Sequence, residues 1–258
     1  MSKTVVFLGP TLSTRAAVER LGAADLDALQ LRGPARCGDV WRAVEDGYTS
    51  IGLIDGYFDH SLSVWHKELL WALHRGCAVF GASSMGALRA AELHIFGMRG
   101  VGRIFEAFRD GLLNDDDEVA VVHADPTQDY RPQSEALVNI RVTLQLAVSE
   151  GVLCRSVAQR YVALARARFY PERHFAQLLS DAAEVPELAA KVSALRTWLG
   201  PKFERRVNQK AEDAIELLQI LCRAEPPVAL EADRPQFAFA YTEGFHELIR
   251  RQRRDSTE

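Results

Sequence analysis

Two adjacent serines, Ser83 and Ser84, stand where an apolar segment of the chain gives way to a helical one. Residues 77–80 predict a short buried strand, and residues 85–96 have the periodicity of a helix closed by a glycine. A Gly-Ala pair between the strand and the serines allows a sharp turn. This order places a hydroxyl at the carboxyl end of a strand, beside backbone N–H groups that can bind an oxyanion.

The spacing around Ser84 approximates the G-x-S-x-G turn that carries the nucleophile of many serine hydrolases. Ala82 stands in place of the first glycine, and Gly86 is the second. Serine is also among the best helix N-cap residues, so a structural role for the pair stays open. The choice between Ser83 and Ser84 as nucleophile stays open as well.

Two histidines and one acid are candidates to assist such a nucleophile. His66 falls early in the helix after the third predicted strand and His123 ends the fifth, so either could act as general base. Asp55 ends the third strand and could orient a histidine as the third member of a triad. The alternatives are structural: a half-buried His66 beside a tryptophan, and an Asp55 that ties down a loop.

Other polar residues are candidates to contact a substrate. Arg89 and Glu92 lie one helical turn apart after the serines, where they can form an ion pair. Arg89 could instead hold a substrate carboxylate by two parallel hydrogen bonds. A polar loop that contains Tyr130 and Arg131 follows the fifth predicted strand and could close over the site.

The loop Gly9-Pro10-Thr11 follows the first predicted strand, and we expect it to contact substrate. It has neither the G-x-G-x-x-G nor the G-K-[ST] pattern, and its proline lacks an N–H donor, which argues against nucleotide binding. The acidic run at residues 114–118 matches no calcium loop, and the four cysteines lack metal-ligand spacing. We therefore expect no cofactor and no metal.

The composition is ordinary for a soluble globular protein: 258 residues, 48% hydrophobic and 26% charged, with a formal net charge of -4. The mildly acidic balance argues against a nucleic-acid-binding protein. The sequence shows neither a signal-peptide pattern nor an apolar run of membrane-spanning length. We expect a cytoplasmic protein that binds neither nucleic acid nor membrane.

In the first half of the chain, short apolar segments alternate with helical ones. This order predicts an α/β fold with a mostly parallel sheet, flavodoxin-like or Rossmann-like, and helices on both faces. The predicted strands are residues 4–8, 28–31, 50–54, 77–80 and 119–122. Because the carboxyl ends of parallel strands meet at one edge, we expect the loops at Gly9, Asp55, Ser83 and His123 to converge there.

The second half of the chain predicts helices alone. They are residues 134–150, 156–169, 172–179, 186–199, 208–223 and 245–254. We therefore expect an α/β core domain over residues 1–130 and an all-helical extension over residues 131–258.

Several blocks of the chain resemble the TfuA-like family. They follow the family's order and are residues 9–11, 55–58, 63–68, 81–93, 96–98, 116–120, 130–132 and 134–135. The resemblance implies a partner of YcaO enzymes, which activate a peptide amide with ATP. Together the two proteins install backbone thioamides, as in the biosynthesis of ribosomally made peptides.

The resemblance also implies a task in sulfur delivery. The family's proposed reaction is hydrolysis of the C-terminal thiocarboxylate of a ThiS-like sulfur carrier protein, which releases sulfide for the YcaO partner. The residues fit this chemistry, because Ser84 could attack the carbonyl carbon and hydrosulfide leaves readily. Water activated by His66 or His123 is a serine-independent route.

Two other functions remain open from the sequence. The chain could be a non-catalytic docking partner of a YcaO enzyme, or a small-molecule hydrolase unrelated to sulfur transfer.

Overall fold

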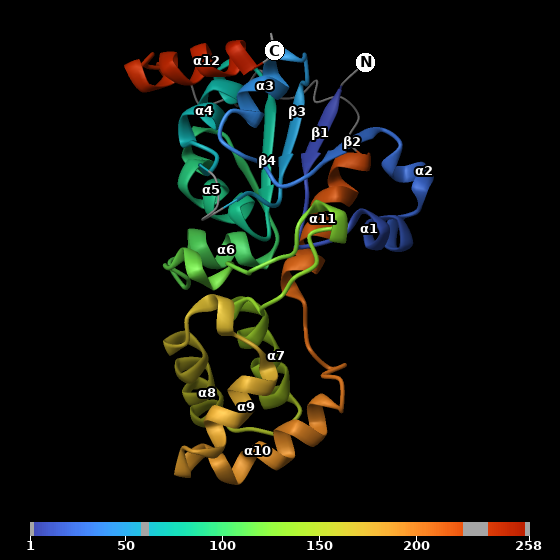
Figure 1. Cartoon of the computed structure of the whole chain (residues 1–258), viewed down its shortest axis with the longest axis vertical. Helices are drawn as coiled ribbons and strands as arrows, with labels where there is room; N and C mark the ends of the chain where they lie inside the picture. The colour runs from blue at the N-terminus through green and yellow to red at the C-terminus, as the bar shows by residue number, and fades with distance from the viewer. Residues whose placement is uncertain (1–2, 58–61, 224–236, 256–258) are drawn as a thin grey trace. The chain divides into compact units, whose positions relative to one another are not determined.

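The structure is a computed structural model that describes residues 3–57, 62–223 and 237–255 (Figure 1). The chain divides into two compact units. The first consists of Met1–Asn114 and Ala211–Glu258, and the second of Asp115–Lys210. The first unit is α/β and the second is helical, and each has a hydrophobic core of its own.

The first unit contains a five-stranded sheet in which every strand is parallel to its neighbours. The strands are β1 (Thr4–Phe7), β2 (Leu29–Arg32), β3 (Ser50–Leu53), β4 (Ala78–Ala82) and β5 (Arg99–Val101). Their order, β2-β1-β3-β4-β5, confirms the parallel α/β fold and is the flavodoxin-like one. The strand order reverses between β1 and β3, and such sheets bind ligands at the carboxyl ends next to that point.

Helices connect the strands of the first unit. They are α1 (Thr14–Leu21), α2 (Ala23–Leu26), α3 (Asp39–Glu45), α4 (His66–His74), α5 (Met85–Leu93) and α6 (Arg103–Arg109), with a 3-10 turn at His94–Phe96. The unit also includes α11 (Gln209–Arg223), from Ala211 onward, and α12 (Glu243–Asp255). None of the helices in the described part of the chain is both long and apolar enough to cross a membrane.

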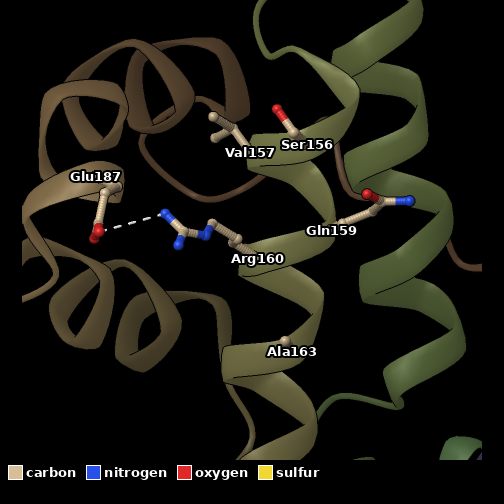
Figure 2. Close-up of a pocket in the computed structure, with 6 residues that line it drawn as sticks. All are labelled: Ser156, Val157, Gln159, Arg160, Ala163 and Glu187. Atoms are coloured by element: carbon tan, nitrogen blue, oxygen red, sulfur yellow. Dashed lines mark ion pairs between the residues drawn. The ribbon is translucent and has the colours of Figure 1, made fainter.

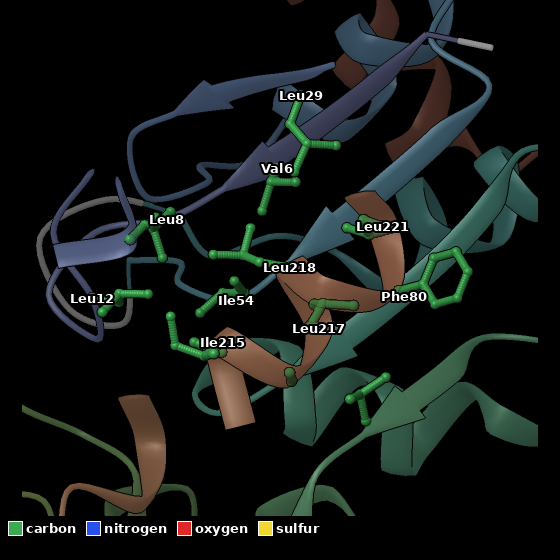
Figure 3. Close-up of a cluster of buried hydrophobic side chains, with 14 of the residues drawn as sticks. Val6, Leu8, Leu12, Leu29, Ile54, Phe80, Ile215, Leu217, Leu218 and Leu221 are labelled. Atoms are coloured by element: carbon green, nitrogen blue, oxygen red, sulfur yellow. The ribbon is translucent and has the colours of Figure 1, made fainter. Parts of the chain in front are cut away.

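One face of the sheet packs against α11 (Figure 3). Successive side chains of a strand point to opposite faces, and Val6 of β1 and Phe80 of β4 share the face that α11 covers. Leu218 and Leu221 of α11 belong to the same buried cluster. Gly52 of β3 leaves room there, since a Cβ at that position would press on Leu221. Each buried aliphatic side chain of this kind contributes roughly 1.5–3 kcal/mol.

The second unit consists of helices around a separate core. Its elements are α7 (Leu137–Ser149), α8 (Arg155–Ala167), α9 (Phe175–Ala183) and α10 (Pro186–Leu199), with 3-10 turns at Asp116–Glu118, Pro126–Gln128 and Tyr170–Glu172. Leu144, Tyr161, Leu179 and Leu195 are buried at its centre. The predicted helices between residues 134 and 199 are therefore confirmed, with ends shifted by a few residues.

The fifth strand lies elsewhere than the sequence predicts. Residues 119–122 are not a strand; the carbonyl of Val119 accepts from Lys210 Nζ, and the N–H of Val122 donates to the Ser134 hydroxyl. The apolar run is buried at Val119 but irregular, because burial does not require strand pairing. The actual edge strand β5 contains Gly100, which lies against the Phe105 ring, and a short glycine-containing segment has little strand signal.

The periodicity of residues 63–74 predicts a helix that begins at Ser63, but α4 begins at His66. Trp65 has an extended backbone, and its N–H donates to the Glu68 carboxylate at 3.1 Å. A carboxylate three residues into a helix commonly satisfies the preceding N–H in this way. The start of α4 is therefore set by a capping contact that hydrophobic periodicity does not reveal.

The two compact units divide the chain differently from the expected boundary at residue 130. Helices α11 and α12 both follow the second unit in sequence, yet their apolar faces join the cores of the first. On α12, Phe245 packs with Trp41 and Trp71. Amphipathic periodicity marks these helices but does not say which core they will join.

Candidate functional site

The turn between β4 and α5 is strained at Ser83. The φ angle of Ser83 is 65°, which L residues rarely adopt. The N–H of Ser84 donates to the carbonyl of Ala82 at 2.8 Å, so Ser83 is the central residue of a γ-turn. Because β4 ends at Ala82 and α5 begins at Met85, the two serines form the whole connection.

Two glycines let the strand and the helix approach closely at this turn. A Cβ on Gly81 would overlap the carbonyl of Gly86, and a Cβ on Gly86 would overlap the carbonyl of Leu53. The N–H of Gly86 also donates to the carbonyl of Ile54 at 3.2 Å, which ties the first turn of α5 to the end of β3. The second glycine of the motif therefore allows backbone to pack directly against backbone.

Both serines are buried, with exposed fractions of 0% for Ser83 and 3% for Ser84. Ser84 holds the N-cap position of α5, but its side chain accepts no hydrogen bond from the helix. Among the described residues the Ser84 hydroxyl has no hydrogen-bond partner at all. A capping role therefore does not account for Ser84, although its hydroxyl is less open than the sequence suggests.

Most backbone N–H groups around the turn already have acceptors. The N–H of Ser84 bonds to Ala82, that of Gly86 to Ile54, and that of Ala87 to the carbonyl of Ser84 at 3.0 Å. Within the described residues the N–H of Met85 donates to no carbonyl. The expected oxyanion pocket is thus reduced to this backbone donor at the first residue of α5.

Asp55 holds the loop Gly9-Pro10-Thr11 at the point where the strand order reverses. Its Oδ2 accepts the N–H groups of Gly9 at 2.9 Å and Thr11 at 3.0 Å. Its Oδ1 accepts the Thr11 hydroxyl at 2.6 Å, and the carboxyl is 1% exposed. The structure thus brings Asp55 and this loop together, and it uses the carboxylate to fix the loop.

His66, Arg89 and Glu92 form a half-exposed polar cluster on α4 and α5. Nε2 of His66 lies 2.6 Å from Oε2 of Glu92, and Nη1 of Arg89 donates to the same oxygen at 2.8 Å. Nε of Arg89 donates to the carbonyl of Val64 at 3.2 Å, which fixes its guanidinium. Partial burial would raise the pKa of Glu92, but hydrogen bonds from His66 and Arg89 outweigh it and lower that pKa.

The structure does not assemble the predicted triad of Ser84, His66 and Asp55. The carboxylate beside His66 is that of Glu92, because Asp55 is occupied by the first loop. Among the described residues no hydrogen bond joins His66 or Asp55 to either serine. The predicted ion pair of Arg89 with Glu92 is present.

His123, Tyr130 and Arg131 belong to one loop of the second unit. Nδ1 of His123 lies 2.7 Å from the carbonyl oxygen of Ala124, and its ring meets that of Tyr130 edge-on at 5.8 Å between centroids. The N–H of Ala124 donates to the carbonyl of Arg131 at 2.9 Å, which closes the loop. These residues thus gather with one another, and their convergence with the loops of the first unit stays a prediction.

The acidic run at residues 114–118 binds arginines of the second unit. Its ion pairs are Asp115 with Arg166, Asp117 with Arg173, and Glu118 with Arg141. Arg173 is 1% exposed and also donates to the carbonyl of Asp117 at 2.9 Å. No group of three or more potential metal-binding side chains occurs among the described residues.

Each unit has a cleft, and neither is lined by the two serines. In the second unit a cleft of about 450 Å³ borders α8 and α10 (Figure 2). Arg160 and Glu187 face each other across it with 3.5 Å between nitrogen and oxygen, and both side chains are more than half exposed. In the first unit a cleft of about 570 Å³ lies among α3, the segment before α4, and α12.

The sequence does not predict which residues meet in the cleft of the first unit, because they come from distant segments of the chain. Arg42 of α3 donates to Gln252 of α12, 210 positions away. Arg36 and Arg251 line the same cleft. The amphipathic pattern of residues 245–254 is the available signal, and it indicates a docked helix without indicating the surface on which it docks.

Fold and site together define an α/β protein of flavodoxin-like strand order with a strained serine turn after its fourth strand. Residues 55–174 match the model of a family described as TfuA-like protein. This match confirms the resemblance to the TfuA-like family over that range. The matched range includes Asp55, His66, both serines and Glu92. A comparison with curated proteins gives no match.

Proposed function

We propose that this protein hydrolyses the C-terminal thiocarboxylate of a ThiS-like carrier protein and supplies the sulfide to a YcaO enzyme for peptide thioamide formation. The observation that carries the proposal is Ser84, which follows the parallel strand β4 and holds the N-cap position of α5 without accepting a capping hydrogen bond. The TfuA-like match supports the choice of partner, because that family is associated with YcaO enzymes.

The reaction proceeds by addition and elimination at the thiocarboxylate carbon. The Oγ of Ser84 adds to that carbon, its proton passes to a base, and the N–H of Met85 binds the oxyanion. The C–S bond then breaks and hydrosulfide leaves. Water hydrolyses the resulting ester, so that one thiocarboxylate and one water yield one carboxylate and one hydrogen sulfide.

His66 is the base that the contacts favour. When its Nε2–H donates to Glu92, its Nδ1 has a free lone pair and the ring orientation is held. Arg89 in turn keeps Glu92 charged and in place. His123 stays the competing candidate, and Ser83 stays the alternative nucleophile.

The carrier must bring its charged tail to the turn between β4 and α5. Arg89 is the cation next to His66, and Arg131 is an exposed cation with no carboxylate partner among the described residues. In the first unit we assign the loop Gly9-Pro10-Thr11 and Arg89 to substrate contact, and a role for Tyr130 and Arg131 of the second unit stays a prediction. The tail of such a carrier is narrow, which suits a site with little open volume.

The burial of both serines favours a second candidate function, in which the protein is a docking partner without catalytic activity. A serine that is at most 3% exposed reaches a substrate only after the surrounding side chains move. A non-catalytic docking partner of a YcaO enzyme requires no such movement. The two functions make different predictions for a serine variant.

Ser84→Ala tests the proposal directly. Sulfide release from a thiocarboxylated carrier should fall by about 100-fold or more, while binding to the YcaO partner persists. The exposed Ser149→Ala in the second unit serves as control and should leave both unchanged.

Unchanged release in Ser84→Ala would overturn this serine's role. If Ser83→Ala then abolishes release, the nucleophile is Ser83; if only His66→Ala abolishes it, water is the nucleophile. Unchanged release in all three variants would make His123 the next candidate base. Absence of release by the wild-type protein, with the YcaO partner still bound, would establish the docking function instead.

A further inference from the structure

We propose that the cleft among α3, the segment before α4, and α12 binds a small organic anion that carries an apolar ring. Its volume of about 570 Å³ lies within the usual range for small-molecule sites. None of the residues assigned to catalysis or to the carrier tail lines it. The inference therefore goes beyond the proposed function and does not depend on it.

Three arginines from two segments that are distant in the sequence line the cleft. Arg36 precedes α3, Arg42 lies on α3, and Arg251 lies on α12. Among the described residues no carboxylate lies within ion-pair distance of Arg251. Guanidinium groups bind carboxylate and phosphate through paired N–H donors, so their convergence indicates an anion.

One of these arginines has a buried donor without an acceptor. Nε of Arg42 is buried and makes no hydrogen bond within the described residues, although another nitrogen of the side chain donates to Gln252. A buried N–H without an acceptor is unfavourable and rare. An oxygen of a bound anion would supply that acceptor.

Among the described residues, two acids line the cleft. Asp39 accepts the backbone N–H of Arg36 at 2.8 Å and lies 4.0 Å from Arg42. Glu247 pairs with Arg250 at 3.1 Å and with Arg254 at 3.4 Å. Asp39 thus lies at ion-pair distance from Arg42, whereas neither acid pairs with Arg251, which keeps its positive charge for a ligand.

The cleft also offers apolar surface for the body of the ligand. Leu62 is 57% exposed and Trp65 is 37% exposed, high values for large apolar side chains. Gly244 brings the backbone of α12 close to Trp65, since a Cβ there would lie 3.9 Å from the indole. An apolar ring can pack on this indole while its anionic group meets the arginines.

Cys37 adds no competing charge to the cleft. Burial, together with the neighbouring carboxylate of Glu68, raises the pKa of the Cys37 thiol to about 12. The thiol is therefore neutral at physiological pH. Cys37 contributes a small uncharged surface to the wall.

The test uses phenyl phosphate, which combines an apolar ring with an anionic group. Titration of the full-length protein at low ionic strength is followed by tryptophan fluorescence and by calorimetry. We expect saturable binding that weakens at least tenfold in Arg251→Ala, because a hydrogen-bonded ion pair is lost. Arg253→Ala removes the same charge from an exposed position of the same helix outside the cleft, and it should change affinity less than twofold.

Two further ligands separate the contributions of charge and ring. Phenol lacks the anion and should give no saturable binding, whereas inorganic phosphate lacks the ring and should bind more weakly than phenyl phosphate. Trp65→Phe should remove the fluorescence change while calorimetry still detects binding. Absence of saturable phenyl phosphate binding, equal affinity in Arg251→Ala and wild type, or equal binding of phenol would overturn the proposal.

Discussion

Two carboxylates of the first unit, Asp55 and Glu92, illustrate opposite uses of the same chemical group. Asp55 is 1% exposed, and its two oxygens accept three hydrogen bonds from the loop after β1. Glu92 has a 45% exposed side chain and shares one oxygen between His66 and Arg89. The buried acid is committed to holding the backbone, whereas the half-exposed acid orients His66 and Arg89, which solvent can reach.

This contrast also separates stability from activity. Removal of the acceptor for buried backbone N–H groups leaves donors that nothing else satisfies, so the cost falls on folding. An ion pair in contact with water contributes little to folding, so the loss of Glu92 should appear in the reaction. The following variants rank from the largest expected effect to the smallest.

Gly86→Ala tests how tightly the serine turn is packed. The added Cβ would overlap the carbonyl of Leu53, so we expect the unfolding free energy to fall by about 3 kcal/mol or more. Gly111→Ala is the control, since it has open space and only an unfavourable φ of 69°, and it should cost about 1 kcal/mol. Equal effects in urea unfolding would contradict the close approach of β3 and α5.

Asp55→Ala tests whether the buried carboxylate stabilises the fold by holding the loop after β1. The variant leaves the N–H groups of Gly9 and Thr11 without their acceptor, so stability should fall by about 3 kcal/mol. The control is Asp125→Ala: Asp125 accepts the N–H of Thr127 at 2.9 Å in an exposed loop. Its loss should cost about 1 kcal/mol or less, and a reversed order in thermal unfolding would refute the assignment.

Glu68 is a third carboxyl of the first unit, and its contribution to stability should depend on pH. It is fully buried, and burial raises its pKa from 4.5 to about 7, although N–H groups of Trp65, Gly38 and Trp41 oppose the shift. The folded state therefore holds this proton more tightly than the unfolded state. The resulting stabilisation is complete below pH 4.5 and is lost as the pH rises to about 7.

The measurement for Glu68 is the unfolding free energy between pH 4.5 and 8, in wild type and in Glu68→Gln. As the pH rises to neutrality, the unfolding free energy of the wild type should fall by up to about 1 kcal/mol per pH unit relative to that of the variant. Above neutrality the difference between the two proteins should stay constant. Parallel pH profiles of the two proteins would contradict the raised pKa.

Glu92→Gln should have the smallest effect on folding and a clear effect on the proposed reaction. Because the side chain is 45% exposed, we expect a change of about 0.5 kcal/mol or less. Since the pKa of Glu92 is lowered, its small contribution is present above pH 4.5 and is lost as the pH falls through the lowered pKa.

Sulfide release by Glu92→Gln should fall about tenfold or more, because a neutral amide oxygen holds the ring of His66 less strongly than a carboxylate and does not stabilise its protonated form. Glu187→Gln, in an exposed ion pair with Arg160, is the control and should change neither stability nor release. Undiminished release by Glu92→Gln would place the base elsewhere, with His123 as the next candidate.

Local patterns in the sequence predict much of the fold. Helix α10 matches the predicted residues 186–199 because a proline at its start and a glycine after its end mark both termini. Four of the five strands follow apolar runs in the first half of the chain. The exception is β5, where Gly100 replaces a strand-forming side chain so that Phe105 can pack beside the backbone.

The candidate site is predicted only in part. The strand–serine–helix turn is visible in the sequence, since the residues that form it are consecutive. The hydrogen-bond partner of Asp55 cannot be predicted from the sequence. Thr11 lies 44 positions away, and the carboxylate could have bound any loop at the ends of the strands. The same holds for His66 and Glu92, 26 positions apart on two helices.

By itself the sequence determines where backbone turns, helices and strands form, because side-chain size, branching and polarity act on dihedral angles and burial within a few residues. Tertiary structure alone decides that α11 covers the sheet, that Asp55 is committed to a loop, and that Glu92 stands beside His66. The physical reason is that an apolar face or a carboxylate specifies the kind of partner it requires. Which partner it meets depends on the packing of the whole unit.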